Sequence, residues 1–195
     1  PDVFILRSEK NKLSEEQKFT LFLANQIGGG LVFTSDNLKN YSSETQSLYN
    51  EQFPLLKKEI LAVRCESETF VVRFKIDEWE YLAQFNLSNR KKNLTMPEGE
   101  YFDGKSQTFL SGLTQSVLKP FESRCYLKLS PNQKIIGGDR RVFPAAQLVE
   151  EIDENGQVTW KKREKVLGKP TIYFNYSSAD EIPSALRQGQ FQEVG

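Results

Sequence analysis

The carboxylates of residues 98–103 are the first side chains in this sequence whose spacing could support chemistry. Glu98, Glu100 and Asp103 lie close together, and two carboxylates on either side of a bond can act as general acid and general base. However, Pro97-Glu98-Gly99-Glu100 has the composition of a turn, and charged side chains in such segments are mostly solvated. The pattern therefore favours a hydrated loop over a catalytic pair.

A second polar group, Ser35-Asp36-Asn37, directly follows the apolar run 31–34, Leu-Val-Phe-Thr. Polar side chains at the carboxyl ends of parallel strands line the ligand sites of α/β proteins, which makes Ser35 and Asp36 candidates for ligand contact. Asp also commonly caps the turn that follows it. For Asp36 the local pattern favours this capping role over ligand binding.

Composition excludes several classes of site. The chain has no histidine, so neither a His-based triad nor a His-ligated metal site is possible. Cys65 and Cys125 are too few for a disulfide framework or a zinc cluster, and we predict two buried free thiols. We expect no cofactor and no metal. Lys plus Arg and Asp plus Glu both total 26, and this balance favours neither a nucleic acid nor an anionic membrane as a partner.

Two strand–helix units are predicted in residues 1–54. The apolar runs 2–7 and 31–34 suit strands buried on both faces, as in a parallel sheet. A capping box of Ser14 and Gln17 predicts a helix over 14–27, which the glycines after it would end. A second box starting at Ser43 predicts another helix. Such a repeat implies parallel strands joined by right-handed crossovers.

Residues 55–130 change to period-two patterning, which predicts an antiparallel β-sandwich. Its strands are expected at 59–64, 69–76, 80–87, 93–96, 108–110, 115–118 and 123–129. Residues 131–195 are predicted to be a β-rich extension, with a hairpin about Asp153-Glu154-Asn155-Gly156 and a strand at 171–174. Trp160 alternates with polar residues there and is the best candidate for an exposed aromatic platform.

Four segments in this order resemble the α-galactosidases of glycoside hydrolase families 27 and 36. They are Pro1-Asp2-Val3-Phe4-Ile5-Leu6-Arg7, Gly30-Leu31-Val32-Phe33-Thr34-Ser35-Asp36-Asn37-Leu38, Phe53-Pro54-Leu55 and Leu118-Lys119-Pro120-Phe121-Glu122-Ser123-Arg124. In that family a Pro-Asp pair follows barrel strand seven, and a short polar motif with Asp and Leu ends strand eight before the β-domain. The resemblance covers about residues 1–130.

The resemblance implies an α+β chain made of the last two units of a (β/α)₈ barrel, residues 1–54, followed by the sandwich. It places Asp2 at the wall of the sugar pocket, beside the candidate substrate-binding residues Ser35 and Asp36. Retaining glycosidases need a nucleophilic and an acid/base carboxylate. In this family both belong to earlier barrel strands, so we expect no catalytic residue in this chain and no turnover by the chain alone.

Two alternatives remain open: a non-catalytic carbohydrate-binding module, and a structural or oligomerising β-domain. The strand–helix start favours the hydrolase fragment, because neither alternative needs barrel units. The expected partner is a galactoside, and an exposed barrel edge makes a homo-oligomer possible. We expect a piece of a longer, cytoplasmic protein. No apolar run reaches the roughly 18 residues of a membrane span.

Overall fold

The computed structural model describes residues 5–6, 13–29, 33–130, 135–138, 142–143, 146, 149–154, 157–162, 171–174 and 190–193. The helical elements are α1 (Glu15–Gly28), the 3₁₀ turn η1 (Leu38–Asn40) and α2 (Ser43–Asn50). The strands are β1 (Glu59–Glu66), β2 (Thr69–Ile76), β3 (Trp79–Asn86), β4 (Lys92–Thr95), β5 (Glu100–Asp103), β6 (Thr108–Ser111), β7 (Gln115–Leu118), β8 (Ser123–Leu129), β9 (Ile135–Gly138), β10 (Val149–Glu154), β11 (Gln157–Lys162), β12 (Thr171–Phe174) and β13 (Gln190–Glu193).

The predicted N-terminal cap of α1 is found in the structure, and the cap of α2 lies one residue before the predicted position. Ser14 Oγ accepts the Gln17 amide at 3.3 Å, and Gln17 Oε1 accepts the Ser14 amide at 2.9 Å, so the capping box is confirmed. The helix ends at Gly28. The start of α2 is capped by Ser42, whose Oγ accepts the Thr45 amide at 3.2 Å, and not by Ser43 as the sequence had suggested.

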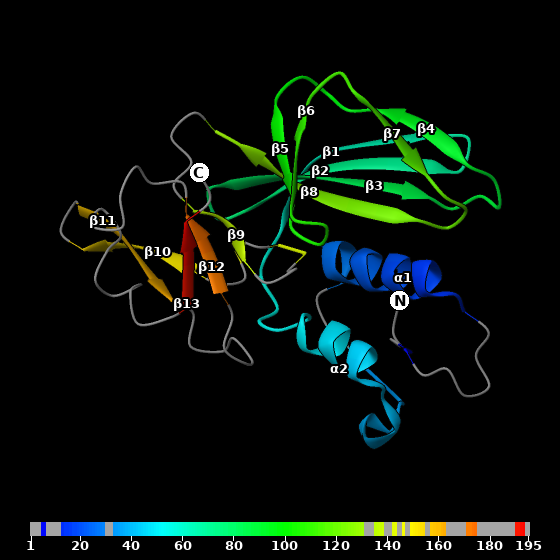
Figure 1. The fold of residues 1–195 in the computed structure, drawn as a ribbon, viewed down its shortest axis with the longest axis horizontal. Coiled ribbons are helices and arrows are strands. Elements are labelled where there is room, and N and C mark those ends of the chain that lie inside the picture. The colour runs from blue at the N-terminus through cyan, green and yellow to red at the C-terminus, as the bar shows by residue number, and fades with distance from the viewer. Residues whose placement is uncertain are drawn as a thin grey trace.

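Residues 59–129 form an antiparallel sheet in the order β1-β2-β3-β8-β5-β6, with β4 and β7 paired in a separate ladder (Figure 1). The antiparallel prediction for this region is confirmed. The predicted solvated turn at Pro97-Glu98-Gly99-Glu100 was wrong in part, because β5 begins at Glu100 and lies between β8 and β6. Tyr101 and Phe102, only 2% and 3% exposed, bury their rings on opposite faces of the sheet, and this burial outweighs the turn signals before them.

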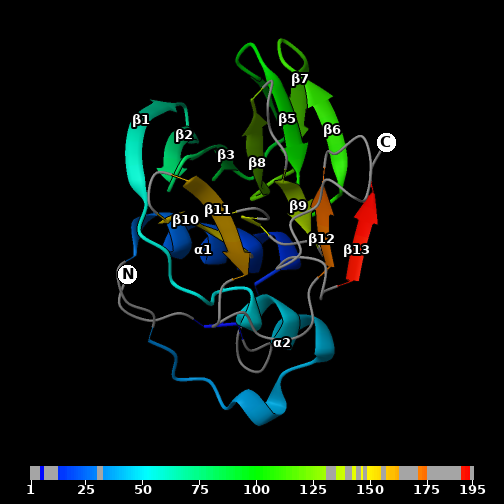
Figure 2. The same ribbon diagram turned by 90° about the vertical axis from the view of Figure 1, so that its left-hand side faces the viewer.

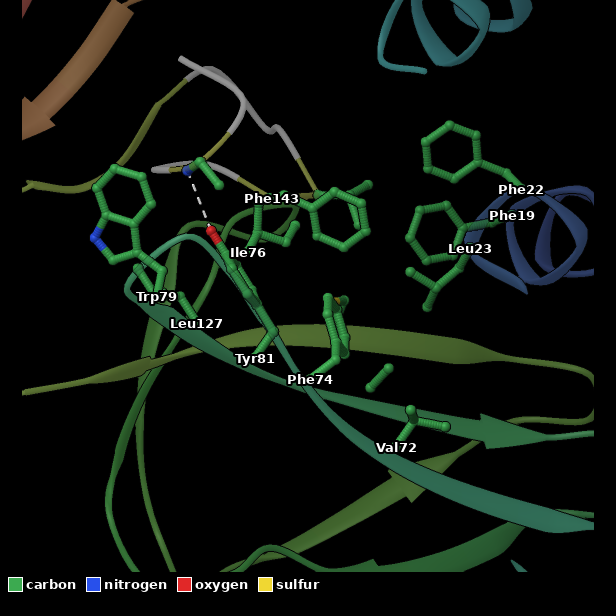
Figure 3. Packing of buried hydrophobic residues seen from close by; sticks show 14 of the residues in the cluster. Phe19, Phe22, Leu23, Val72, Phe74, Ile76, Trp79, Tyr81, Leu127 and Phe143 are labelled. Carbon is green, nitrogen blue, oxygen red and sulfur yellow. Dashed lines mark hydrogen bonds between the residues drawn. The ribbon is translucent and has the colours of Figure 1, made fainter. Parts of the chain in front are cut away.

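One face of the large sheet packs against α1 (Figure 1). Phe19, Phe22 and Leu23 of the helix meet the alternate buried residues of β2 and β3 (Figure 3). Phe74 and Tyr81 stack with ring centroids 5.4 Å apart. The Tyr81 hydroxyl accepts a hydrogen bond from the Ala146 amide at 3.2 Å. This contact ties residues beyond β8 to the main core.

The β4–β7 ladder covers part of the other face. A second cluster of Leu82, Met96, Tyr101 and Tyr126 is buried on that side. The buried hydroxyls of Ser116, in β7, and Tyr126, in β8, share a hydrogen bond of 3.2 Å. Alternate residues of β3 and β8 therefore reach two different cores, which explains the period-two pattern of the sequence.

The described C-terminal strands form two small sheets. β10 and β11 pair antiparallel from Glu154–Gln157 to Val149–Lys162, so the predicted hairpin is confirmed, although residues 155–156 at its turn lie outside the described residues. β12 lies between β9, which is antiparallel to it, and β13, which is parallel (Figure 2). Trp160 is in β11, but its side chain lies outside the described part.

The predicted strands at 2–7 and 31–34 are not found where they can be checked. Residues 5–6 and 33–34 are described, and none of them is in a strand. The Leu6 amide donates to a side chain, Asp36 Oδ2, at 2.7 Å, and this bond takes the place of a strand ladder at that position. The remaining residues of both runs lie outside the described part.

The cysteine prediction is half correct. Cys125 is buried in the main core, while Cys65 is exposed, and both are free thiols. Cys65 lies on β1, which among the described strands pairs only with β2, at the edge of the large sheet, and is exposed along its whole length (Figure 2). An edge strand beyond the reach of α1 leaves even its apolar side chains uncovered.

Candidate functional site

Asp36 connects two segments that are distant in sequence. Its Oδ2 accepts the Leu6 amide at 2.7 Å and the Tyr41 hydroxyl at 2.6 Å. Burial, and then the bond to Asp36, raise the pKa of Tyr41 far above its usual range, so the phenol stays a donor. The turn cap predicted for Asp36 is supplied by Asn37, whose Oδ1 accepts the Lys39 amide at 3.2 Å. Asp36 thus serves as a clamp on both segments.

The other predicted substrate-binding residues are only partly placed by the structure. Ser35 precedes Asp36 in the chain and its side chain is exposed. Asp2 lies outside the described residues. The structure therefore brings Ser35, Asp36 and the main chain of Leu6 together, and sugar contact by Asp2, Ser35 or Asp36 stays a prediction.

A hollow of about 390 Å³ lies among polar and charged side chains of the described residues. It lies between the first turn of α1, the β5–β6 turn and the start of β8. Its walls combine apolar residues with carboxylates and Lys105. We call it the α1–β8 hollow. Sequence reasoning missed this hollow, because its walls come from four segments with no common spacing pattern.

Most carboxylates around the α1–β8 hollow already have partners. Glu15 pairs with Lys18 at 2.7 Å. Glu122 accepts the Arg124 Nε at 2.9 Å and, through its other oxygen, the Lys119 amide at 2.6 Å. These bonds fix the shape of the rim. They leave Glu15 and Glu122 poorly suited to exchange protons with a substrate.

Glu16 is also unsuited to acid catalysis. Its backbone N–H at the start of α1, and then the Ser14 hydroxyl, lower the pKa of its carboxyl. A general acid needs the opposite shift, so that it holds a proton near neutral pH. The hollow is therefore a candidate for binding and not for glycosidic bond cleavage.

The three carboxylates first singled out in the sequence do not converge on one point. Asp103 is 7% exposed, and its Oδ1 accepts the amides of Lys105 and Ser106 at 2.9 and 3.2 Å. Glu100 accepts the Ser111 hydroxyl at 3.2 Å. Glu98 lines a separate hollow of about 160 Å³. No acid–base pair is formed by them.

Neither a metal site nor a membrane-spanning helix is found in the described part of the chain. It holds no group of three or more acidic or cysteine side chains placed to bind a metal ion. Neither of its helices combines the length and the hydrophobicity that crossing a bilayer demands.

Comparison with known proteins gives similarity of fold. No protein-family model and no curated protein matches the chain. Among solved structures, α-galactosidase I from Mortierella vinacea matches with a TM-score of 0.53 and 9% identity, over 66% of this chain and 38% of that one. A GH27 β-L-arabinopyranosidase from Geobacillus stearothermophilus matches with a TM-score of 0.51 and 13% identity, over 63% and 32%.

A third structure, named provisionally as an α-galactosidase/melibiase from Bacteroides fragilis, gives a TM-score of 0.54 and 16% identity, over 66% of this chain and 33% of that one. The chain thus spans about a third of the length of the structures it matches. The resemblance to family 27 α-galactosidases that the sequence indicated is confirmed at the level of the fold.

Proposed function

We propose that this chain is the C-terminal part of a glycoside hydrolase that resembles the α-galactosidases and releases terminal α-galactosides with retention. The observation that carries the proposal is the fold similarity over 61–66% of the chain to enzymes of that family. The four family-like segments of the sequence, found in the expected order, point the same way. The role belongs to the longer protein, because the chain spans only about a third of those structures.

In this proposal residues 1–54 are the end of the catalytic barrel, 55–130 are a β-sandwich and 131–195 are an extension. Asp2, Ser35 and Asp36 belong to the wall of the sugar pocket, and the catalytic carboxylates belong to earlier strands. The Asp36 bonds to Leu6 and Tyr41 support a positioning role for Asp36, since they hold the segment after Asp2 against the bend at residue 36.

The test is hydrolysis of an aryl α-galactoside by the longer protein, followed by proton NMR from the first turnovers. We expect the α-anomer of galactose to appear first, because a retaining mechanism passes through two inversions. Asp2→Asn should weaken substrate binding. First release of the β-anomer, or no turnover of any aryl α-glycoside, would contradict the proposal.

A second candidate function is association with another protein or another copy through β1. Ile60 and Val63 are 46% and 60% exposed on this edge strand, and bare apolar edges promote association. Light scattering of the chain and of its Val63→Lys variant tests this idea. A mass that falls to the monomer value only in the variant would support it, and a monomeric parent chain would end it.

A further inference from the structure

The α1–β8 hollow contains a cationic donor with no oxygen partner. The Nζ of Lys105 lies 3.6 Å from the centroid of the Phe19 ring. It makes no hydrogen bond and no ion pair with any described residue. Desolvation lowers the pKa of this lysine. An ammonium held over a ring at the wall of a hollow is thus available to a ligand acceptor.

The hollow also offers an acceptor that the fold leaves unused. Asp103 lines it and is 7% exposed. Both turn amides bond to Oδ1, while Oδ2 takes no hydrogen bond in the described part of the chain. A carboxylate oxygen can accept two hydrogen bonds, so Asp103 offers a nearly buried acceptor in the same hollow as the Lys105 donor.

The charges that line the α1–β8 hollow and its volume indicate which class of ligand it could bind. Carboxylates from α1, β5 and Glu122 would repel an anion, and Lys105 would repel a cation. A neutral ligand whose groups both donate and accept hydrogen bonds can bind to the carboxylates and to Lys105. Hydroxyls do this, and about 390 Å³ lies in the range of small-molecule sites. The apolar floor of Phe19, Cys125 and Val142 suits the C–H faces of a sugar ring.

We propose that the α1–β8 hollow is a saccharide-binding site, with Asp103 accepting a hydrogen bond from one sugar hydroxyl and Lys105 donating a hydrogen bond to another. The choice of a saccharide among neutral polyols rests on the proposed function. Such a site would hold a carbohydrate between α1 and the large sheet.

The test uses the 195-residue chain, labelled with ¹⁵N and titrated with raffinose. We expect amide shifts at Ser106, Ser123 and their neighbours, with millimolar affinity. Asp103→Asn keeps the Oδ1 bonds but replaces the open acceptor with a donor, and Lys105→Met keeps the stem over Phe19 but removes the donor. Each should weaken binding about tenfold, as expected for loss of a hydrogen bond to a charged group.

Lys75→Met is the matched control, since Lys75 lies on the opposite face of the sheet, on β2, and it should leave raffinose affinity unchanged. Parallel titrations use inorganic phosphate and spermidine. Shifts at these residues with either ion and not with raffinose would overturn the proposal, as would raffinose shifts confined to residues 33–41. If the longer protein hydrolyses α-galactosides while the chain shows no raffinose shifts in the hollow, the saccharide-binding site fails and the proposed function stands.

Discussion

At the scale of single residues, Asp36 shows how one carboxylate can replace a piece of regular structure. Its Oδ2 accepts hydrogen bonds from the Leu6 amide and the Tyr41 hydroxyl, and Leu6 is fully buried in the main core. The sequence identified Asp36 as a polar residue at an element end, yet it assigned the cap to the wrong neighbour. Short polar runs such as Ser35-Asp36-Asn37 contain several side chains able to cap, and only the backbone geometry decides between them.

Tyr41→Phe should lower the free energy of unfolding by about 1–2 kcal/mol, because the substitution removes a hydrogen bond to a carboxylate. Tyr49→Phe is the matched control: its ring packs 5.9 Å from Tyr41, but its hydroxyl has no hydrogen bond within the described residues. Urea unfolding of both variants measures the difference. Equal losses would show that the Tyr41 hydroxyl does not stabilise the clamp.

Lys58 is expected to make the stability of the protein depend on pH. Desolvation lowers its pKa to about 8 from 10.5, with the ammonium 3.4 Å from Gln26 Oε1. Between those pH values the unfolded state binds more protons than the folded state, so this residue makes the protein more stable as pH rises. Below pH 8 its burial costs stability.

Lys58→Met should therefore raise the free energy of unfolding near pH 7 by about 1 kcal/mol, a value discounted for partial hydration. The gain should shrink as pH rises toward 10. Lys57→Met, at the exposed neighbouring position, should show neither effect. Chemical unfolding of the three proteins from pH 6 to 10 provides the measurement, and a gain that does not change with pH would refute the assignment.

At the scale of elements, the sequence predicted most strands of residues 59–129 but missed β5. The strands it found are bounded by clear turns and alternate in polarity. β5 is four residues long and follows Pro97-Glu98-Gly99, so its local signal is that of a turn. Long-range pairing with β8 and β6 is what makes it a strand, and no local pattern reports such pairing.

Gly112 shows the same dependence on distant contacts. A Cβ at this position would lie 2.4 Å from the Pro97 carbonyl oxygen and 2.6 Å from the Gly99 nitrogen, and both are backbone atoms that cannot turn aside. Gly112→Ala should lower the free energy of unfolding by about 2 kcal/mol or more. A Cβ at Gly28 meets nothing within 4 Å, so Gly28→Ala should be neutral or slightly stabilising. Thermal unfolding compares the two, and a harmless Gly112→Ala would show that the loop before β5 is placed differently.

At the scale of the whole molecule, the described residues form a β-rich body with α1 packed against one face of its large sheet. The fold similarity to the family 27 structures covers 63–66% of the chain. The barrel remnant was predicted from apolar runs whose described residues are not in strands. Barrel strands need neighbours on both sides, and a short run of sequence cannot by itself supply them.

Comparison of initial rates on an aryl α-galactoside, between the 195-residue chain and the longer protein, tests the central claim most directly. We expect turnover by the longer protein and none by the chain, because losing both carboxylates removes the nucleophile and the acid together. Activity staining of a gel at the mass of the chain serves as the control for a contaminating hydrolase. Turnover by the purified chain that passes this control would contradict the account.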